Sequence, residues 1–306
     1  MARSKPKPAQ PSRDTENIKV SWLVKALGAV MLGALLCSYL SLCLLYHQGQ
    51  WQIVLHPTHT ASQPPQSASL VRFGPGESAQ PQLLGEWHPA SPGSRYSGLT
   101  ILFLPAGDGS LSDSTSMLEA LHGIGLNVFA FDYRGYGRSA DIHPSQQRMT
   151  EDAEAAWRYL TTTRDVPNHQ IIPYGTGVGA SLAANLAAEH PEIPALILDS
   201  PHADLLDEAR RDSRSSLLPV GLLFHERFSL AAPLASLHTP KLLLTDSSAP
   251  RPEAFARAAE PKITVTLTSR SGALLDETIT RFLDQYLPEP SRQLVPSPAP
   301  SATNPR

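Results

Sequence analysis

Short apolar segments alternate with helical patterns through most of this chain, and this alternation restricts the fold more than any other feature. Six segments are apolar enough to be buried strands, namely 99–105, 126–132, 171–174, 195–199, 241–245 and 263–268. Helical patterns lie at 115–125, at 150–163 with Thr150 as N-cap, at 180–190 and at 274–287. Continuous apolar strands between helices are typical of a mostly parallel sheet with helices on both faces, so we expect an α/β fold. The interval 203–240 has no clear strand and predicts a helical cap over one end of the sheet.

The segment at 26–46 is apolar and carries no charge over 21 residues, which is long enough to cross a bilayer as a helix. Six Lys or Arg residues precede it, and the first one after it is Arg72. This asymmetry predicts an anchor over 21–46 with the N-terminus in the cytoplasm and the bulk of the chain outside it, in the periplasm if the source is bacterial. The apolar run is longer than a usual signal peptide and no small-x-small site follows it, which favours an uncleaved anchor.

Composition divides the rest of the chain into two tails and one domain. The polar, Pro-containing segments 1–20 and 288–306 are expected to be disordered, and 50–287 to be folded. The net charge of −3 gives no reason to expect nucleic acid as a partner. Both cysteines lie in the anchor, and no His/Asp/Glu spacing indicates a metal site, so neither a metal nor a cofactor is predicted.

A glycine-rich turn, Gly175-x-Gly177-x-x-Ala180, lies between a predicted strand and a predicted helix. It matches the dinucleotide fingerprint G-x-G-x-x-G/A, and Asp199 ends the next strand, where an acid could bind a ribose. However, the fingerprint belongs at the first strand–helix turn of its domain, and two such units precede this one. Dinucleotide binding therefore remains a minor alternative.

The surroundings of the turn favour another interpretation. The runs "NVFAFDYRGYGRS" (127–139), "AAWRYL" (155–160) and "PYGTGVGASLAANLA" (173–187) resemble the α/β-hydrolase superfamily. The closest resemblance is to membrane-anchored bacterial members near the serine aminopeptidase (S33) and BEM46-like groups, and it covers roughly 50–287. It implies an α/β-hydrolase fold in which a G-x-S-x-G elbow carries the nucleophile.

Superposing that motif puts Gly177 at the position of the nucleophilic serine, and the chain has no other G-x-S-x-G. Glycine has no nucleophilic atom, although it relieves the backbone strain that the elbow residue usually bears. The family's catalytic His should follow the last strand, but 268–283 contains none. The acid should lie near Ser248 or Ala249, and Asp246 is the nearest carboxylate. Nucleophile, base and expected acid are therefore all missing from their family positions.

The oxyanion side also departs from the family, since Pro105-Ala106 stands where the family has His-Gly. The N–H groups just past this pair and of Val178 remain, so a partial anion site is expected. The resemblance implies a cleft roofed by 203–240 that suits an apolar or acyl ligand and is lined by Pro105, Ala106, Thr176, Gly177 and Val178.

These observations predict a membrane-anchored α/β-hydrolase-like protein that is catalytically degenerate and acts in ligand binding or scaffolding. The alternative is an active esterase or peptidase-like hydrolase with a non-family mechanism. Its acid would be Asp246 or Asp199, and its base would be His202 or His225. The sequence indicates no particular protein partner.

The anchor orientation leads to a prediction that a pair of fusions can check. Because basic residues lie on the N-terminal side of 26–46, a C-terminal alkaline phosphatase fusion expressed in a bacterial host should be active. A C-terminal green fluorescent fusion exported by the same route should be dark. The reverse pair of results would place the domain in the cytoplasm.

Overall fold

The computed structural model describes residues 20–59, 69–74, 81–202, 205–211, 216–246, 252–268 and 272–287, so both predicted tails lie outside the described residues apart from Val20. The chain divides into two compact units, Met1–Gln48 and Gly49–Arg306. The first unit contains most of α1 (Val20–Gly49), whose described side chains include none that is buried. Its most apolar window has a mean hydropathy of 2.1, and it is the one helix among the described residues that is long and apolar enough to cross a membrane.

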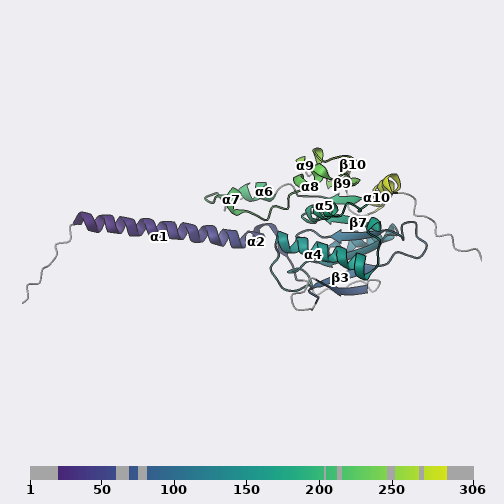
Figure 1. The fold of residues 1–306 in the computed structure, drawn as a ribbon, viewed down its shortest axis with the longest axis horizontal. Helices are drawn as coiled ribbons and strands as arrows, with labels where there is room; N and C mark the ends of the chain where they lie inside the picture. The colour runs from purple at the N-terminus through teal and green to yellow at the C-terminus, as the bar shows by residue number, and fades with distance from the viewer. Residues whose placement is uncertain are drawn as a thin grey trace, which may run out of the picture. The chain divides into compact units, whose positions relative to one another are not determined.

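The second unit is built on an eight-stranded sheet in the order β10-β9-β8-β7-β4-β6-β3-β2 (Figure 1). Its strands are β2 (Ser69–Phe73), β3 (Leu83–His88), β4 (Thr100–Leu104), β6 (Asn127–Asp132), β7 (Ile171–Thr176), β8 (Leu196–Asp199), β9 (Lys241–Asp246) and β10 (Lys262–Leu267). The six strands from β4 onward are parallel, whereas β3 pairs antiparallel with both β2 and β6. The predicted α/β fold with a mostly parallel sheet is confirmed.

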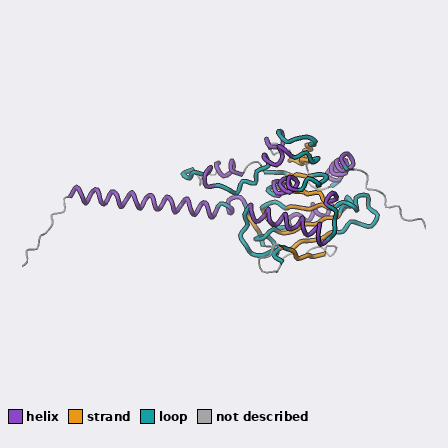
Figure 2. The backbone as a smooth tube through the Cα atoms, viewed as in Figure 1, coloured by secondary structure: helices purple, strands orange, loops and turns teal. Residues whose placement is uncertain are grey.

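Helices cover both faces of this sheet (Figure 2). On one face, α3 (Thr115–Gly123) and α10 (Ala273–Tyr286) share a buried core with alternate strand residues such as Ile101 and Phe103. Successive strand residues point to opposite faces, so Leu102 and Leu104, also fully buried, belong to the other face. There α5 (Gly179–Glu189) packs against β7, β8 and α4 (Gln146–Arg158).

Local details differ from the sequence-based expectations in two places. The prediction that Thr150 caps its helix is wrong, because α4 begins one turn earlier, where the Ser145 hydroxyl accepts from the Arg148 N–H at 3.3 Å. The Thr150 hydroxyl instead donates to the Gln146 carbonyl oxygen within the helix. The antiparallel edge formed by β2 and β3 was not anticipated, since neither segment lies between two helical patterns.

The remaining short elements lie at the periphery. They are α2 (Trp51–Val54), β1 (His56–Pro57), β5 (Asp108–Gly109), α6 (Leu205–Arg211), α7 (Val220–Leu223), α8 (Ala231–Ser236) and α9 (Glu253–Ala256). Between 203 and 240 the described residues form three short helices and no strand. The function of this interval as a cap over the sheet stays a prediction.

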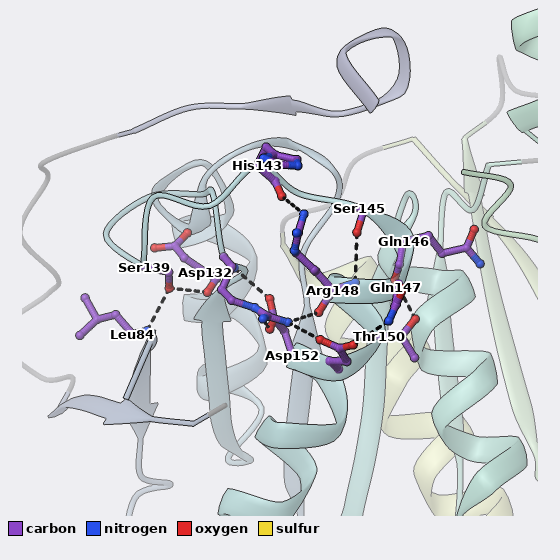
Figure 3. A network of polar contacts seen from close by, with 12 residues as sticks. Leu84, Asp132, Ser139, His143, Ser145, Gln146, Gln147, Arg148, Thr150 and Asp152 are labelled. Atoms are coloured by element: carbon purple, nitrogen blue, oxygen red, sulfur yellow. Dashed lines mark hydrogen bonds and ion pairs between the residues drawn. The ribbon is translucent and has the colours of Figure 1, made fainter. Parts of the chain in front are cut away.

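The run Asp132 to Ser139 forms a turn that polar contacts hold in place (Figure 3). The Arg134 guanidinium donates through Nε to Asp152 at 2.6 Å and through Nη2 to Glu151 at 2.8 Å, while the Arg134 N–H donates to Asp152 at 2.9 Å. The Asp132 carboxylate accepts from the Leu111 N–H at 2.8 Å. Charged residues of this run therefore join the end of β6 to α4 and to the segment after β5.

The Arg134 contacts generate a stability prediction with an internal control. Asp152→Ala should lower the free energy of unfolding by about 3 kcal/mol or more, because it removes the fully buried partner of a guanidinium that is itself only 8% exposed. Glu151→Ala should cost about 1 kcal/mol or less, because that side chain is 47% exposed. Urea denaturation of the full chain in detergent measures both, and equal losses would contradict a central role for Asp152.

Candidate ligand site at the glycine elbow

The chain turns sharply between β7 and α5, and Gly177 is the residue at the corner. Its φ is +52°, in the left-handed region that favours glycine. Its N–H donates to the carbonyl oxygen of Asp199 at 3.1 Å, which ties the corner to the end of β8. The expectation that glycine relieves backbone strain at this position is confirmed.

The two flanking glycines are required by close backbone approach. A Cβ atom on Gly175 would lie 2.2 Å from the carbonyl oxygen of Gly179. A Cβ atom on Gly179 would lie 2.2 Å from the carbonyl oxygen of Leu104. Neither distance is sterically possible, so the start of α5 can reach the ends of β7 and β4 only with glycine at both positions. Packing and turn geometry thus account for the glycine pattern without a bound phosphate.

The space over Gly177 is partly taken by two other residues. A Cβ atom at position 177 would lie 3.0 Å from the Cβ of Ala106 and 3.5 Å from Cδ2 of the His202 ring. The Ala106 methyl group therefore crowds the place where a serine side chain would begin. The His202 imidazole is brought to the elbow from the loop after β8. Of the four weak catalytic candidates, His202 is the one whose side chain the structure places against Gly177.

Tyrosines of the Asp132 turn fix the segment after β4. The Tyr133 hydroxyl donates to the Pro105 carbonyl oxygen at 3.3 Å, and the Tyr136 hydroxyl donates to the Gly107 carbonyl oxygen at 2.9 Å. Burial raises the pKa of both tyrosines, so both remain protonated donors near neutral pH. This segment is thereby held beside the residue that follows the elbow.

Gly107 and Val178 lie in contact across the elbow. A Cβ atom on Gly107 would lie 2.8 Å from Cγ2 of Val178 and 2.6 Å from Cδ2 of Leu55. The structure therefore brings together three residues of the predicted lining, Ala106, Gly177 and Val178. Pro105 precedes this contact in the chain, and Thr176 is the half-buried last residue of β7. The cleft itself stays a prediction.

Asp199 is buried, and its carboxylate is already engaged. One oxygen accepts from the Tyr174 hydroxyl and the other from the Ser200 hydroxyl, both at 3.0 Å. Ser200 has a φ of +44°, which is unusual for a residue with a side chain. The end of β8 is therefore tightly constrained, and these bonds give Asp199 a structural role in the turn that leads to His202.

Asp246 ends β9 at the same edge of the sheet. Asp199 pairs in register with Leu244, so Asp246 lies two residues further along the neighbouring strand. It is half-buried. Ser248 and Ala249, at the expected position of the acid, lie outside the described residues. The carboxyl ends of β7, β8 and β9 thus place Gly177, Asp199 and Asp246 on one edge.

His225 has partners in a different part of the second unit. Its Nδ1 lies 2.6 Å from Nε2 of Gln50, and its backbone N–H donates to Oε1 of the same glutamine at 2.8 Å. Its Nε2 lies 3.5 Å from Glu226. These contacts join His225 to the segment that follows α1, so its described geometry does not favour a role at the elbow.

One further group of ligand-type side chains was not apparent from sequence spacing. Glu154, Glu189 and His190 offer atoms within 4.8 Å of one another, because α4 packs against the end of α5. His190 Nε2 lies 2.9 Å from Glu154, and the ring stacks on Trp157 with centroids 4.5 Å apart. This ion pair accounts for the cluster as a contact between two helices.

Solved structures show the same architecture. A Pyrococcus furiosus esterase superposes with a TM-score of 0.60 and 19% identity over 77% of this chain and 98% of its own. An alpha-beta hydrolase from Vibrio vulnificus superposes with a TM-score of 0.55 and 22% identity over 72% of this chain and 80% of its own. These likenesses, the sheet order and the sharp turn between β7 and α5 define an α/β-hydrolase fold.

The chain belongs to the serine aminopeptidase S33 family, whose model matches residues 108–281. It is 30% identical to the uncharacterized protein Rv2307c of Mycobacterium tuberculosis over 279 residues, which cover 85% of this chain and 96% of that protein. It is 38% identical to the alpha/beta hydrolase domain-containing protein 17C of Xenopus tropicalis over 130 residues, covering 41% of this chain and 39% of that protein. Family membership leaves the catalytic status of this chain open.

The crowding at the elbow predicts a specific coupling between two positions. Gly177→Ser should lower the free energy of unfolding by about 1–3 kcal/mol, because a residue with a side chain must adopt the left-handed backbone. Ala106→Gly in the same chain should recover part of that loss, since it removes the methyl group 3.0 Å from the new Cβ.

Gly93→Ser is the matched control for this cycle. Gly93 has a φ of +80°, but a Cβ there would meet nothing within 4 Å. Its serine variant should show backbone strain that Ala106→Gly does not relieve. Urea denaturation measures the free energy of unfolding of each single and double variant. Purely additive effects of Gly177→Ser and Ala106→Gly on this free energy would contradict the steric coupling.

Proposed function

We propose that this chain is a membrane-anchored member of its family that has lost serine-hydrolase activity and binds an apolar or acyl ligand at the elbow. The main support for this proposal is the contact between positions 177 and 106, which hold Gly177 and Ala106. Where the resemblance requires a serine there is no side chain, and where it requires a glycine a methyl group approaches the elbow. Both changes affect the same contact, which supports a corner adapted to the absence of a nucleophile.

Loss of the other catalytic groups supports the same proposal. The segment after β10 carries no histidine in the sequence, so the family position for the base is vacant. Without a base, a hydroxyl at position 177 would stay protonated near neutral pH. Pro105 also lacks the N–H that the first residue of the family's His-Gly pair carries.

The chemistry around the elbow supports an apolar ligand. Ala106, Gly107 and Val178 meet there, and none of them has a polar side chain. The buried carboxylate of Asp199 already accepts two hydrogen bonds within the protein. A ligand at this edge would therefore gain mainly from burial of apolar surface and from backbone N–H groups.

Membrane anchoring and the outward orientation of the domain are part of the proposal. The length and mean hydropathy of α1 support the anchor, and the basic residues before it support a cytoplasmic N-terminus. The resemblance to membrane-anchored bacterial members near the BEM46-like group is part of the proposal as well. No nucleic acid, metal or cofactor is part of this proposal.

One observation favours a second candidate function, hydrolysis by a non-family mechanism. The His202 ring lies 3.5 Å from the position that a Cβ on residue 177 would take. An imidazole there could act as a general base toward a water molecule, with Asp199 or Asp246 as the nearby acid. Such a mechanism would not form a covalent serine intermediate.

Inertness of the purified full chain in detergent is the decisive prediction. The protein should take up no fluorophosphonate probe, which labels activated serines, and should not hydrolyse p-nitrophenyl esters of short or long acyl chains. His202→Ala should change neither result, because no reaction depends on the imidazole.

The Gly177→Ser variant tests whether restoring the nucleophile alone restores activity. It should stay inactive, since a serine alone leaves only the residual acceleration of about 10³–10⁴ over water that binding and an intact oxyanion hole supply. Robust esterase activity in Gly177→Ser that His202→Ala abolishes would show that a base is in place. Turnover by the unmodified chain that survives repurification and falls on His202→Ala would support the second candidate instead.

A further inference from the structure

The residue that follows α1 is bonded to the cap. Gln50 is 1% exposed, although it comes directly after the last residue of a helix without buried side chains. Its Oε1 accepts from the His225 N–H at 2.8 Å, and its Nε2 donates to the carbonyl oxygen of Leu223 at 3.4 Å. The point at which the chain enters the second unit is therefore fixed against the end of α7.

The segment 216–223 exposes apolar side chains at the same place. Leu217 is 80% exposed and Leu222 is 85% exposed. They are the most exposed large apolar side chains described outside α1, well above Leu70 at 47% and Leu274 at 49%. The Leu222 N–H donates to the Pro219 carbonyl oxygen at 2.9 Å, so the leucines project from a compact turn. Burial of these two side chains against an apolar partner would be favourable.

An arginine of α6 lies beside the turn that carries Leu222, and an aromatic residue begins a helix that packs against the same α6. Arg210 of α6 reaches α7, because its Nη2 would lie 3.2 Å from a Cβ on Gly221. Arg210, Arg211 and Arg227 are all exposed. Trp51, half-exposed at the start of α2, follows Gln50 directly, and α2 packs against α6. Exposed leucines beside arginine side chains are common on surfaces that rest in the headgroup region of a bilayer.

An anchor formed by α1, as the proposed function has it, would bring Gln50 close to the headgroup region. A helix crossing the hydrocarbon core through residue 46 rises about 1.5 Å per residue, so Gln50 lies only about 6 Å beyond the core. The hydrogen bond from Gln50 to the Leu223 carbonyl oxygen would then keep Leu222, the preceding residue, near the same boundary.

We propose that segment 216–223 docks on the bilayer that α1 crosses, with Leu217 and Leu222 inserted at the boundary between headgroups and acyl chains. This inference rests on the membrane anchoring in the proposed function and adds a second contact with the same membrane. The cap also contacts the elbow helix, since the Ser181 hydroxyl of α5 donates to the Ser229 carbonyl oxygen at 3.1 Å. A docked cap would therefore hold α5 at a short distance from a source of acyl chains.

A depth measurement on the full chain tests the docking. Cys37 and Cys43 are the only cysteines, so Cys37→Ala with Cys43→Ala gives a background for a single Leu222→Cys label. The labelled protein carries an environment-sensitive nitrobenzoxadiazole group and is reconstituted in vesicles of phosphatidylcholine with phosphatidylglycerol. Its emission should be blue-shifted and quenched at least twofold by lipids that carry a doxyl group near the headgroup. Leu274→Cys on α10 is the matched control and should give water-like emission without quenching.

A third label separates failure of the docking from failure of the anchor. Cys43→Ala leaves Cys37, in the middle of α1, as the labelling site, and its fluorophore should be quenched by deep doxyl lipids. Quenching at 37 with water-like emission at 222 overturns the docking and leaves the anchor intact. Water-like emission at 37 overturns the anchor itself. Equal quenching at 222 and 274 would show non-specific adsorption and would also overturn the docking.

Discussion

The structure depends on how closely α5 approaches the ends of β7 and β4. Gly175 and Gly179 allow this approach, since a Cβ atom on either would overlap a backbone carbonyl oxygen. The approach fixes the corner at Gly177 and, through it, the hydrogen bond to the end of β8. The positions of Ala106, Val178 and His202 around the corner follow from this crossing, because each belongs to an element that the crossing brings together.

The residues that maintain the elbow differ from those that would make it catalytic. Tyr133 and Tyr136 hold the segment after β4, and Arg134 with Asp152 joins the turn to α4. None of them has to react with a substrate, so the contacts that hold the elbow do not depend on a nucleophile or a base. The same separation explains why membership of a hydrolase family does not decide whether this chain hydrolyses anything. At the Gly177 corner, the Ala106 methyl group makes the return of a serine sterically unfavourable as well as chemically incomplete.

The second constraint lies where the chain leaves α1. Gln50 is buried by contacts with residues 223–225, which are more than 170 positions away in the sequence, and these contacts determine which face of the cap is nearest the attachment point. The exposed leucines of the cap are adjacent to this junction. In the proposed docking, an anchor attached at this junction would bring the leucine-bearing surface toward the bilayer.

The sequence by itself determined the architecture and which residues stand at the positions where the family carries its catalytic groups. Apolar strands between helical patterns predicted the parallel sheet, and Gly177 with a histidine-free segment at 268–283 predicted a degenerate elbow, because both depend on residue types and local order along the chain. The N-cap at Thr150 was wrong, since a serine one turn earlier meets the first free N–H groups. Only the tertiary structure decided that His202 lies at the elbow, that Ala106 crowds position 177 and that Gln50 binds the cap. These contacts join residues distant in sequence, and they depend on the packing of strands and on the direction of each turn, which no local pattern specifies.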